Sequence, residues 1–103
     1  MTIYYAIVTD RITSDQRSAI SEVVKRDASG GWWHQFRDAW IAGGQSARHW
    51  RDVLGGIITP DGADSLLVLR LPAESQRHWA AYATPTKQDW LGRTYSRDPK
   101  LSH

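Results

Sequence analysis

The chain has 103 residues, of which 41% are hydrophobic and 23% are charged, and this balance is typical of one ordinary globular domain. It contains no cysteine, which excludes disulfide bonds, thiolate metal sites and cysteine nucleophiles. Thirteen basic residues against eleven acidic ones give a formal charge of +2, which is too small to identify nucleic acid as a partner by itself. We expect one domain over residues 1–96 and a flexible tail over 97–103.

The first expected element is a strand over residues 3–9, a β-branched and aromatic run that stops at Asp10. Continuous apolarity of this kind is typical of a central strand that is buried on both faces. The run has no basic leader in front of it and is too short for a membrane span. We therefore expect a soluble, cytoplasmic protein with no membrane partner.

A helix and a hairpin follow. Ser14 is the expected N-cap of a helix over 14–28, where apolar residues recur at helical spacing. The aromatic run over 32–42 is interrupted by Arg37 and Asp38, which predicts either a short hairpin or one bent strand. Regular alternation would place Trp33 and Gln35 on one side, and Trp32, His34 and Phe36 on the other.

The second half of the chain begins with a helix capped by Ser46, with its apolar residues on one face. Residues 59–62, Thr-Pro-Asp-Gly, have the residue types of a turn and lead into a second buried strand over 65–71. The pattern over 73–83 fits either an edge strand or a helical turn. A last helix is expected to open at Thr84 and Pro85 and to run to about Tyr95.

This order predicts an α+β fold, a ferredoxin-like β-α-β(β)-α-β sandwich with a short C-terminal helical appendage. A two-layer fold leaves one face of its sheet bare. Burial of that face in a homodimer would explain the presence of six tryptophans. The residues expected at a dimer or partner interface are Trp32, Trp33, His34, Trp40 and Trp79.

Asp10 is the strongest single candidate for chemistry. A carboxylate at the mouth of a buried strand can hold Mg²⁺ or Mn²⁺, although an aspartate after a strand is also an ordinary turn or capping residue. One carboxylate makes a weak metal site unless a two-fold axis brings a second copy beside it. The adjacent Arg11 would either neutralise this carboxylate or hold a phosphate.

Arg48 and Arg51, on the second expected helix, are candidate phosphate contacts, with a merely solvated helix face as the alternative. No phosphate-binding glycine loop, zinc-protease motif or nucleophile elbow occurs in the sequence. The four histidines show no pair at the spacing that would place both on one helical face for a metal.

Several of these segments together resemble one known family. They are the first strand ending in Asp10, the Gly31-Trp32-Trp33-His34 and Ala39-Trp40-Ile41 segments, Ser46-Ala47, Asp64-Ser65-Leu66-Leu67-Val68, Trp79-Ala80-Ala81-Tyr82 and Trp90-Leu91. Over residues 3–91 the chain resembles the SinR-like family, the small ferredoxin-like relatives of the CRISPR-associated adaptation nuclease subunit rather than the transcriptional repressor of that name. The most specific part of the resemblance is the Trp-Trp-His stretch.

The resemblance implies a ferredoxin-like homodimer. In the catalytic relatives, a carboxylate at the end of the first strand of each protomer binds a divalent metal across the dimer axis for phosphodiester cleavage, and Asp10 matches that position. The relatives tend to carry Tyr-Asp where this chain has Thr9-Asp10-Arg11. The leading hypothesis is a homodimer near nucleic acid, with endonuclease or endoribonuclease activity that depends on Mg²⁺ or Mn²⁺.

The rival hypothesis is a non-enzymatic protein-interaction module that needs no metal. Such a module would be a scaffold, or a phage or mobile-element protein that regulates or inhibits a defence complex. In this case exposed tryptophan and arginine side chains would supply the binding energy.

Overall fold

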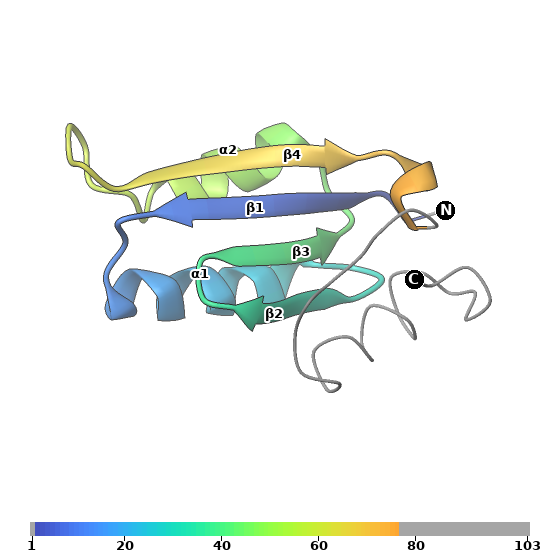
Figure 1. Ribbon diagram of the computed structural model, residues 1–103, viewed down its shortest axis with the longest axis horizontal. Coiled ribbons are helices and arrows are strands. Elements are labelled where there is room, and N and C mark those ends of the chain that lie inside the picture. Colours follow the sequence, from blue (N-terminus) through green and yellow to red (C-terminus); the bar gives the residue numbers. More distant parts are fainter. Residues whose placement is uncertain (1, 77–103) are drawn as a thin grey trace.

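The computed structural model describes residues 2–76, and its elements follow the predicted order (Figure 1). The strands are β1 (Tyr4–Asp10), β2 (Trp32–Phe36), β3 (Ala39–Gly43) and β4 (Ser65–Leu71). The helices are α1 (Ser14–Asp27), α2 (Ala47–Gly55) and a short 3₁₀ turn, η1 (Ala73–Gln76). The run over 32–42 is therefore a hairpin and not one bent strand. The predicted last helix over 84–95, the tail over 97–103 and Trp79 lie outside the described residues.

The four strands form one antiparallel sheet in the order β2-β3-β1-β4, and both helices cover the same face of it (Figure 1). Each helix connects two strands that have a third strand between them. This arrangement confirms the predicted ferredoxin-like α+β sandwich. No helix in residues 2–76 is long and apolar enough to cross a membrane.

The core lies between the helices and the covered face of the sheet. Ile7 of β1 pairs with Trp40 of β3 on one side and with Val68 of β4 on the other. Trp40 and Trp50 are both 0% exposed, and each indole N–H has an acceptor: Trp40 Nε1 donates to Ser21 Oγ at 3.2 Å, and Trp50 Nε1 to the Gly44 carbonyl at 3.1 Å. Two of the six tryptophans are therefore core residues with satisfied donors.

The caps of the two helices differ in how well the sequence predicted them. Ser46 caps α2 as expected, accepting a hydrogen bond from His49 N at 3.0 Å. The prediction of Ser14 as the N-cap of α1 is wrong by one residue, because Thr13 is the cap. Thr13 Oγ1 accepts from Gln16 N, and Gln16 Oε1 accepts from Thr13 N, which forms a reciprocal capping box.

A bulge changes which face of the sheet Phe36 occupies. The register between β2 and β3 shifts between Trp33 and Phe36. The extra residue reverses the alternation, and the Phe36 ring meets the Trp33 ring edge to face with centroids 4.8 Å apart. The predicted grouping of Phe36 with Trp32 and His34 is therefore wrong.

Candidate functional site

The face of the sheet opposite the helices is apolar on all four strands. Paired residues on neighbouring antiparallel strands share a face, so the strand register defines this surface as rows. The first row is Phe36, Ala39, Val8 and Leu67, the second is Trp33, Ile41, Ala6 and Leu69, and the third is Gly43, Tyr4 and Leu71. These three rows contain no charged side chain.

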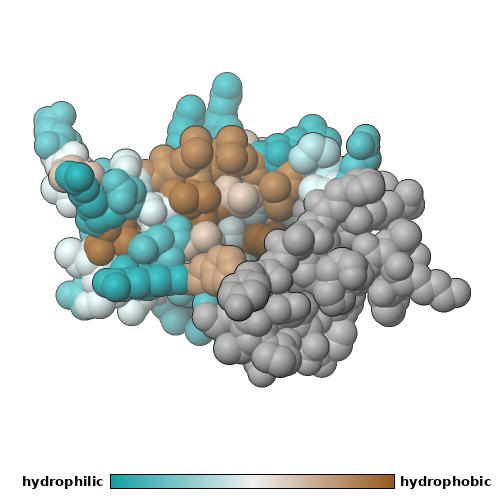
Figure 2. All heavy atoms as spheres, in the orientation of Figure 1, coloured by the Kyte–Doolittle hydropathy of each residue, from teal (hydrophilic) through white to brown (hydrophobic). Residues whose placement is uncertain are grey.

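Part of this face is open to solvent. Leu67 is 53% exposed, Leu69 is 50% exposed and Val8 is 40% exposed, and we call these three residues the open-face patch. Figure 2 shows the apolar side chains gathered over β1 and β4 with polar side chains around them. The prediction of 65–71 as a buried strand is therefore wrong, since β4 is covered by α2 on one face only. The same holds for Val8 in β1, which was expected to be buried on both faces.

The sequence of β4 signals this patch, because its apolar run is longer than a strand covered on one face requires. A strand covered by helices on one face needs apolar residues at alternate positions only. β4 carries leucine or valine at every position from Leu66 to Leu69. In a two-layer fold, the surplus half of that run has to face away from the helices.

Asp10 stands at the rim of the open face. It pairs with Ser65 at the end of β1. This pair lies two residues along each strand from the pair of Val8 and Leu67, so Asp10 points to the same, open side of the sheet. Its carboxylate lies 3.8 Å from Arg11 Nε, and both side chains are 72% exposed. A contact of this length between two solvated groups leaves the carboxylate accessible.

Asp10 has no cluster of further metal-binding side chains around it in the described part of the chain. Among residues 2–76, no three side chains from histidine, cysteine, aspartate and glutamate come together as possible ligands of one metal ion. Mg²⁺ can be held by one or two carboxylates and waters, with the remaining ligands from a phosphate substrate. Asp10 supplies one such carboxylate, and a second carboxylate beside it would strengthen the site.

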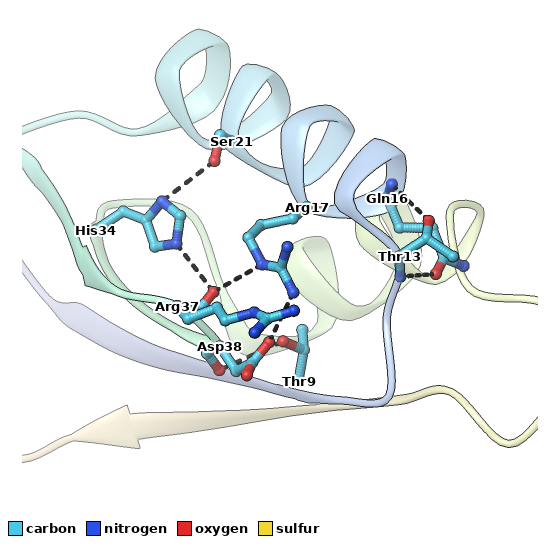
Figure 3. A network of polar contacts seen from close by, with 8 residues as sticks. All are labelled: Thr9, Thr13, Gln16, Arg17, Ser21, His34, Arg37 and Asp38. Atoms are coloured by element: carbon cyan, nitrogen blue, oxygen red, sulfur yellow. Dashed lines mark hydrogen bonds and ion pairs between the residues drawn. The ribbon is translucent and has the colours of Figure 1, made fainter.

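A polar network holds the β2–β3 turn against α1 (Figure 3). Arg17 donates through Nε to the Arg37 carbonyl at 3.0 Å, and through Nη2 to Asp38 Oδ1 at 3.3 Å. The Asp38 carbonyl accepts from Thr9 N at 2.9 Å, directly before Asp10 in the chain. The network therefore fixes the backbone from which Asp10 projects.

His34 belongs to this network and is not placed as a metal ligand. Ser21 Oγ already accepts from Trp40, so its hydroxyl hydrogen is available to His34 Nδ1 at 3.3 Å. The Nε2–H of the same ring then donates to the Arg37 carbonyl at 3.2 Å. Both ring nitrogens have protein partners, which leaves no free lone pair for a metal ion.

The predicted interface residues separate into two groups. Trp32, Trp33 and His34 line one surface hollow of about 350 Å³ with Gly31 and Gln35, along the edge strand β2. Lys25 Nζ lies 5.8 Å from the centre of the Trp32 ring. Trp40 is fully buried beneath the helices, so its assignment to an interface is wrong.

Arg48 and Arg51 lie together, in a group that does not include Asp10. With Ala47 of α2 and Leu66, Leu67 and Val68 of β4, they line a groove of about 280 Å³ between the helix and the outer edge of the sheet. Arg51 contacts Asp52 at 2.7 Å, with both side chains largely exposed. Arg11 is not part of this groove, so the three predicted phosphate contacts do not form one cluster.

A separate acidic centre joins the end of α1 to the start of α2. Asp27 Oδ1 accepts from Arg26 Nε at 2.7 Å, and Asp27 Oδ2 lies 3.0 Å from His49 Nε2. The hydrogen bond from Arg26, followed by the one from His49, lowers the pKa of Asp27 from 3.8 to about 2. A carboxylate held this firmly in its charged form is a structural anchor and a poor proton donor or acceptor at neutral pH.

Comparisons with known proteins leave the family resemblance untested. No family model matches the chain, and no curated protein matches it.

Proposed function

We propose that the protein is a protein-interaction module that forms a homodimer through its open sheet face. The observation that carries this proposal is the half-exposure of Leu67 and Leu69, side by side with Val8 on an uncharged surface. Removing apolar surface from water contributes about 25 cal/mol per Å². Contiguous apolar patches on a protein surface mark contact sites more often than isolated exposed leucines do.

A second copy of the chain fits this face for two reasons. A two-fold contact pairs a surface with itself, so the same three rows would supply both sides. Because the rows carry no charge, stacking them would bury no unpaired ion. Asp10, at the rim, would remain in water.

The chemistry of this face favours protein over nucleic acid. Single-stranded nucleic acid binds where exposed aromatic rings stack on bases and cations contact the phosphates. Two of the three aromatic residues in the rows, Tyr4 and Trp33, are buried, and Phe36 on the edge strand is 41% exposed. The central strands present the aliphatic Ala6, Val8 and Ile41. Aliphatic side chains give a base little stacking surface and a phosphate no partner.

The experiment is a measurement of mass in solution by light scattering after size exclusion. At about 100 µM we expect twice the 11.7 kDa of one chain for the natural sequence, and the mass of one chain for Leu69→Glu. Ser18→Glu, which adds the same charge at an exposed position of α1, should remain a dimer. A natural chain that stays monomeric, or a Leu69→Glu variant that still dimerises with unchanged circular dichroism, would contradict the proposal.

A second candidate is the metal-dependent nuclease, which the exposed position of Asp10 on the same side of the sheet favours. A dimer through the open face would bring the two copies of Asp10 to the edge of one interface. Two Asp10 carboxylates that both reach one Mg²⁺, whose ligand distances are about 2.1 Å, would hold that ion, and the ion would supply the charge that binds a phosphodiester and activates a water for its cleavage. Two Asp10 carboxylates more than about 10 Å apart in the dimer would exclude that shared site.

The test of this candidate uses labelled single- and double-stranded RNA and DNA with Mg²⁺, Mn²⁺ or EDTA. Cleavage that requires metal and is lost in Asp10→Asn, while Asp15→Asn retains it, would establish the nuclease. Asp15 is the matched control because it is an exposed carboxylate in the first turn of α1, away from the sheet. Absence of cleavage by the natural chain leaves the interaction module as the function.

A further inference from the structure

A second surface, which shares Leu67 with the open-face patch, lies along the outer edge of β4. Within the sheet of residues 2–76, β4 is the last strand and pairs with β1 alone. An edge strand has backbone N–H and C=O groups that can pair with another extended chain. The groove between this edge and α2 has a volume of about 280 Å³.

The groove combines an apolar floor with a basic rim. Leu66 and Val68 of β4 are partly buried and contribute to its floor, together with Ala47 of α2. Arg48 and Arg51 stand three residues apart on the same face of α2 and lie above it. The two guanidinium groups therefore face an edge strand instead of a carboxylate-rich surface.

The charges on this rim are only partly compensated. Arg51 pairs with its neighbour Asp52, and both side chains are more than half exposed, so water competes with that contact. The Arg48 side chain makes no hydrogen bond or ion pair with another residue of the described part of the chain. Arg70, which shares a face of β4 with Leu66 and Val68, is also exposed. A ligand with carboxylates would complement all three.

We propose that this groove binds an extended acidic peptide segment of another protein, which adds to β4 as a fifth strand. Side chains alternate between the two faces along such a segment. Carboxylates on the helix side would reach Arg48 and Arg51, while apolar side chains on the other side would lie beside Leu67 and Leu69. Guanidinium groups bind carboxylates in bidentate geometry, which also fixes the register of the segment. The partner is thus a strand that alternates between acidic and β-branched residues.

The lining favours a peptide over nucleic acid. None of the described residues that line the groove is aromatic, so they give a base nothing on which to stack. Backbone pairing along a strand edge serves a peptide and not a sugar-phosphate chain. The proposal does not require dimerisation, because Arg48 and Arg51 lie on α2 and outside the dimer face, although Leu67 belongs to both surfaces.

The test measures fluorescence anisotropy of a labelled eight-residue peptide with alternating glutamate and valine. We expect binding with a dissociation constant of about 10–100 µM, and about five-fold weaker binding for Arg48→Ala and for Arg51→Ala. Arg37→Ala removes an arginine from the β2–β3 turn, outside the groove, and should bind as the natural chain does.

Two control ligands complete the test. A peptide with lysine in place of glutamate should not bind, and the amide NMR signals of β4 should shift only with the acidic peptide. The proposal would be overturned if the acidic peptide fails to bind at about 1 mM. It would also be overturned if Arg48→Ala and Arg51→Ala bind the peptide as tightly as the natural chain does. Tighter binding of a thymidine oligonucleotide than of the acidic peptide would also overturn it and assign the arginines to phosphate.

Discussion

The imidazole of His34 lies flat against the indole of Trp40, with ring centroids 4.2 Å apart and 14° between the ring planes. Trp40 is fully buried, whereas His34 is only partly buried on the edge strand β2. The stack therefore ties the outermost strand of the sheet to the core. Hydrogen bonds of His34 to Ser21 and to the Arg37 carbonyl join the same strand to α1 and to the β2–β3 turn.

Variants of His34 should separate the contribution of stacking to stability from that of hydrogen bonding. An aromatic pair contributes about 0.5–1.5 kcal/mol and a hydrogen bond about the same, so His34→Ala should lower the free energy of unfolding by about 2 kcal/mol. His34→Phe retains the stack and should lose about half as much. Urea unfolding followed by tryptophan fluorescence measures both variants. Equal losses would show that the stack contributes nothing.

The Gln16 side chain both caps α1 and bonds to the segment that contains Ile57 and Asp64. Variants of Gln16 should separate these two contributions to stability. Its Oε1 closes the capping box with Thr13 N at 2.8 Å, while its Nε2 donates to Asp64 Oδ2 at 2.6 Å and to the Ile57 carbonyl at 3.0 Å. Gln16→Ala loses all three contacts and should cost about 1–2 kcal/mol of stability. Gln16→Glu keeps the acceptor for Thr13 but places a second carboxylate beside Asp64.

We therefore expect Gln16→Glu to be at least as destabilised as Gln16→Ala at neutral pH. Adding Asp64→Asn should restore part of the lost stability, because it removes the repulsion between the two carboxylates while the asparagine carbonyl can still accept from Thr59 N. Thermal unfolding of the two single variants and the double variant measures this coupling. Independent, additive effects would contradict the direct contact between the two side chains.

The order of elements was predictable because each one carries a strong local signal. The run from Tyr4 to Val8 and the caps around Ser46 depend on residues close together in the chain, and the structure confirms both elements. The N-cap of α1 was missed by one residue because Thr13 and Ser14 are both good caps. Only the position of Gln16, three residues after Thr13, distinguishes them.

The parts of the site that escaped prediction depend on tertiary structure. A single extra residue in β2 moved Phe36 across the sheet, and no residue type in that strand signals a bulge. Leu67 and Leu69 were expected to be buried because an apolar run does not reveal which of its faces the helices cover. Asp10, in contrast, was placed correctly at the end of β1, while its role stays a prediction.

Asp27 should make the stability of the folded protein depend on pH in the acidic range. Its pKa is held at about 2 in the folded protein, below the ordinary 3.8, because Arg26 and His49 bond to the charged form. The folded state thus binds a proton less readily than the unfolded state, so this stabilisation is complete above about pH 4 and is lost as the pH falls towards 2. The unfolding temperature of Asp27→Asn should lie below that of the natural chain at pH 5.

The difference in unfolding temperature between the natural chain and Asp27→Asn should narrow from about pH 4 to about pH 2, where the natural chain also loses the charge of Asp27. Scanning calorimetry across this range gives the measurement. Asp15→Asn, at an exposed carboxylate of the first helical turn, controls for the change of one charge. A difference that stays constant down to pH 2 would show that Asp27 contributes through packing and not through its charge.

Two glycines should respond to alanine in opposite directions. A Cβ at Gly43 would lie 2.5 Å from the Ser29 carbonyl oxygen and 3.0 Å from Tyr4 Cε1, and the backbone atom cannot move without breaking the Ser29 N–H bond to the Gly43 carbonyl. Such overpacking costs about 1–3 kcal/mol. Gly55, in contrast, ends α2 with nothing within 4 Å of an added Cβ.

We therefore expect Gly43→Ala to lower the urea midpoint and Gly55→Ala to raise it, the latter by up to about 1 kcal/mol in free energy of unfolding through reduced backbone entropy of the unfolded chain. The two positions share no contact in the structure, so the double variant should show the sum of the two changes. A neutral Gly43→Ala would mean that the segment around Ser29 moves aside at little cost. In that case the close approach of this loop to β3 would not hold the hairpin in register.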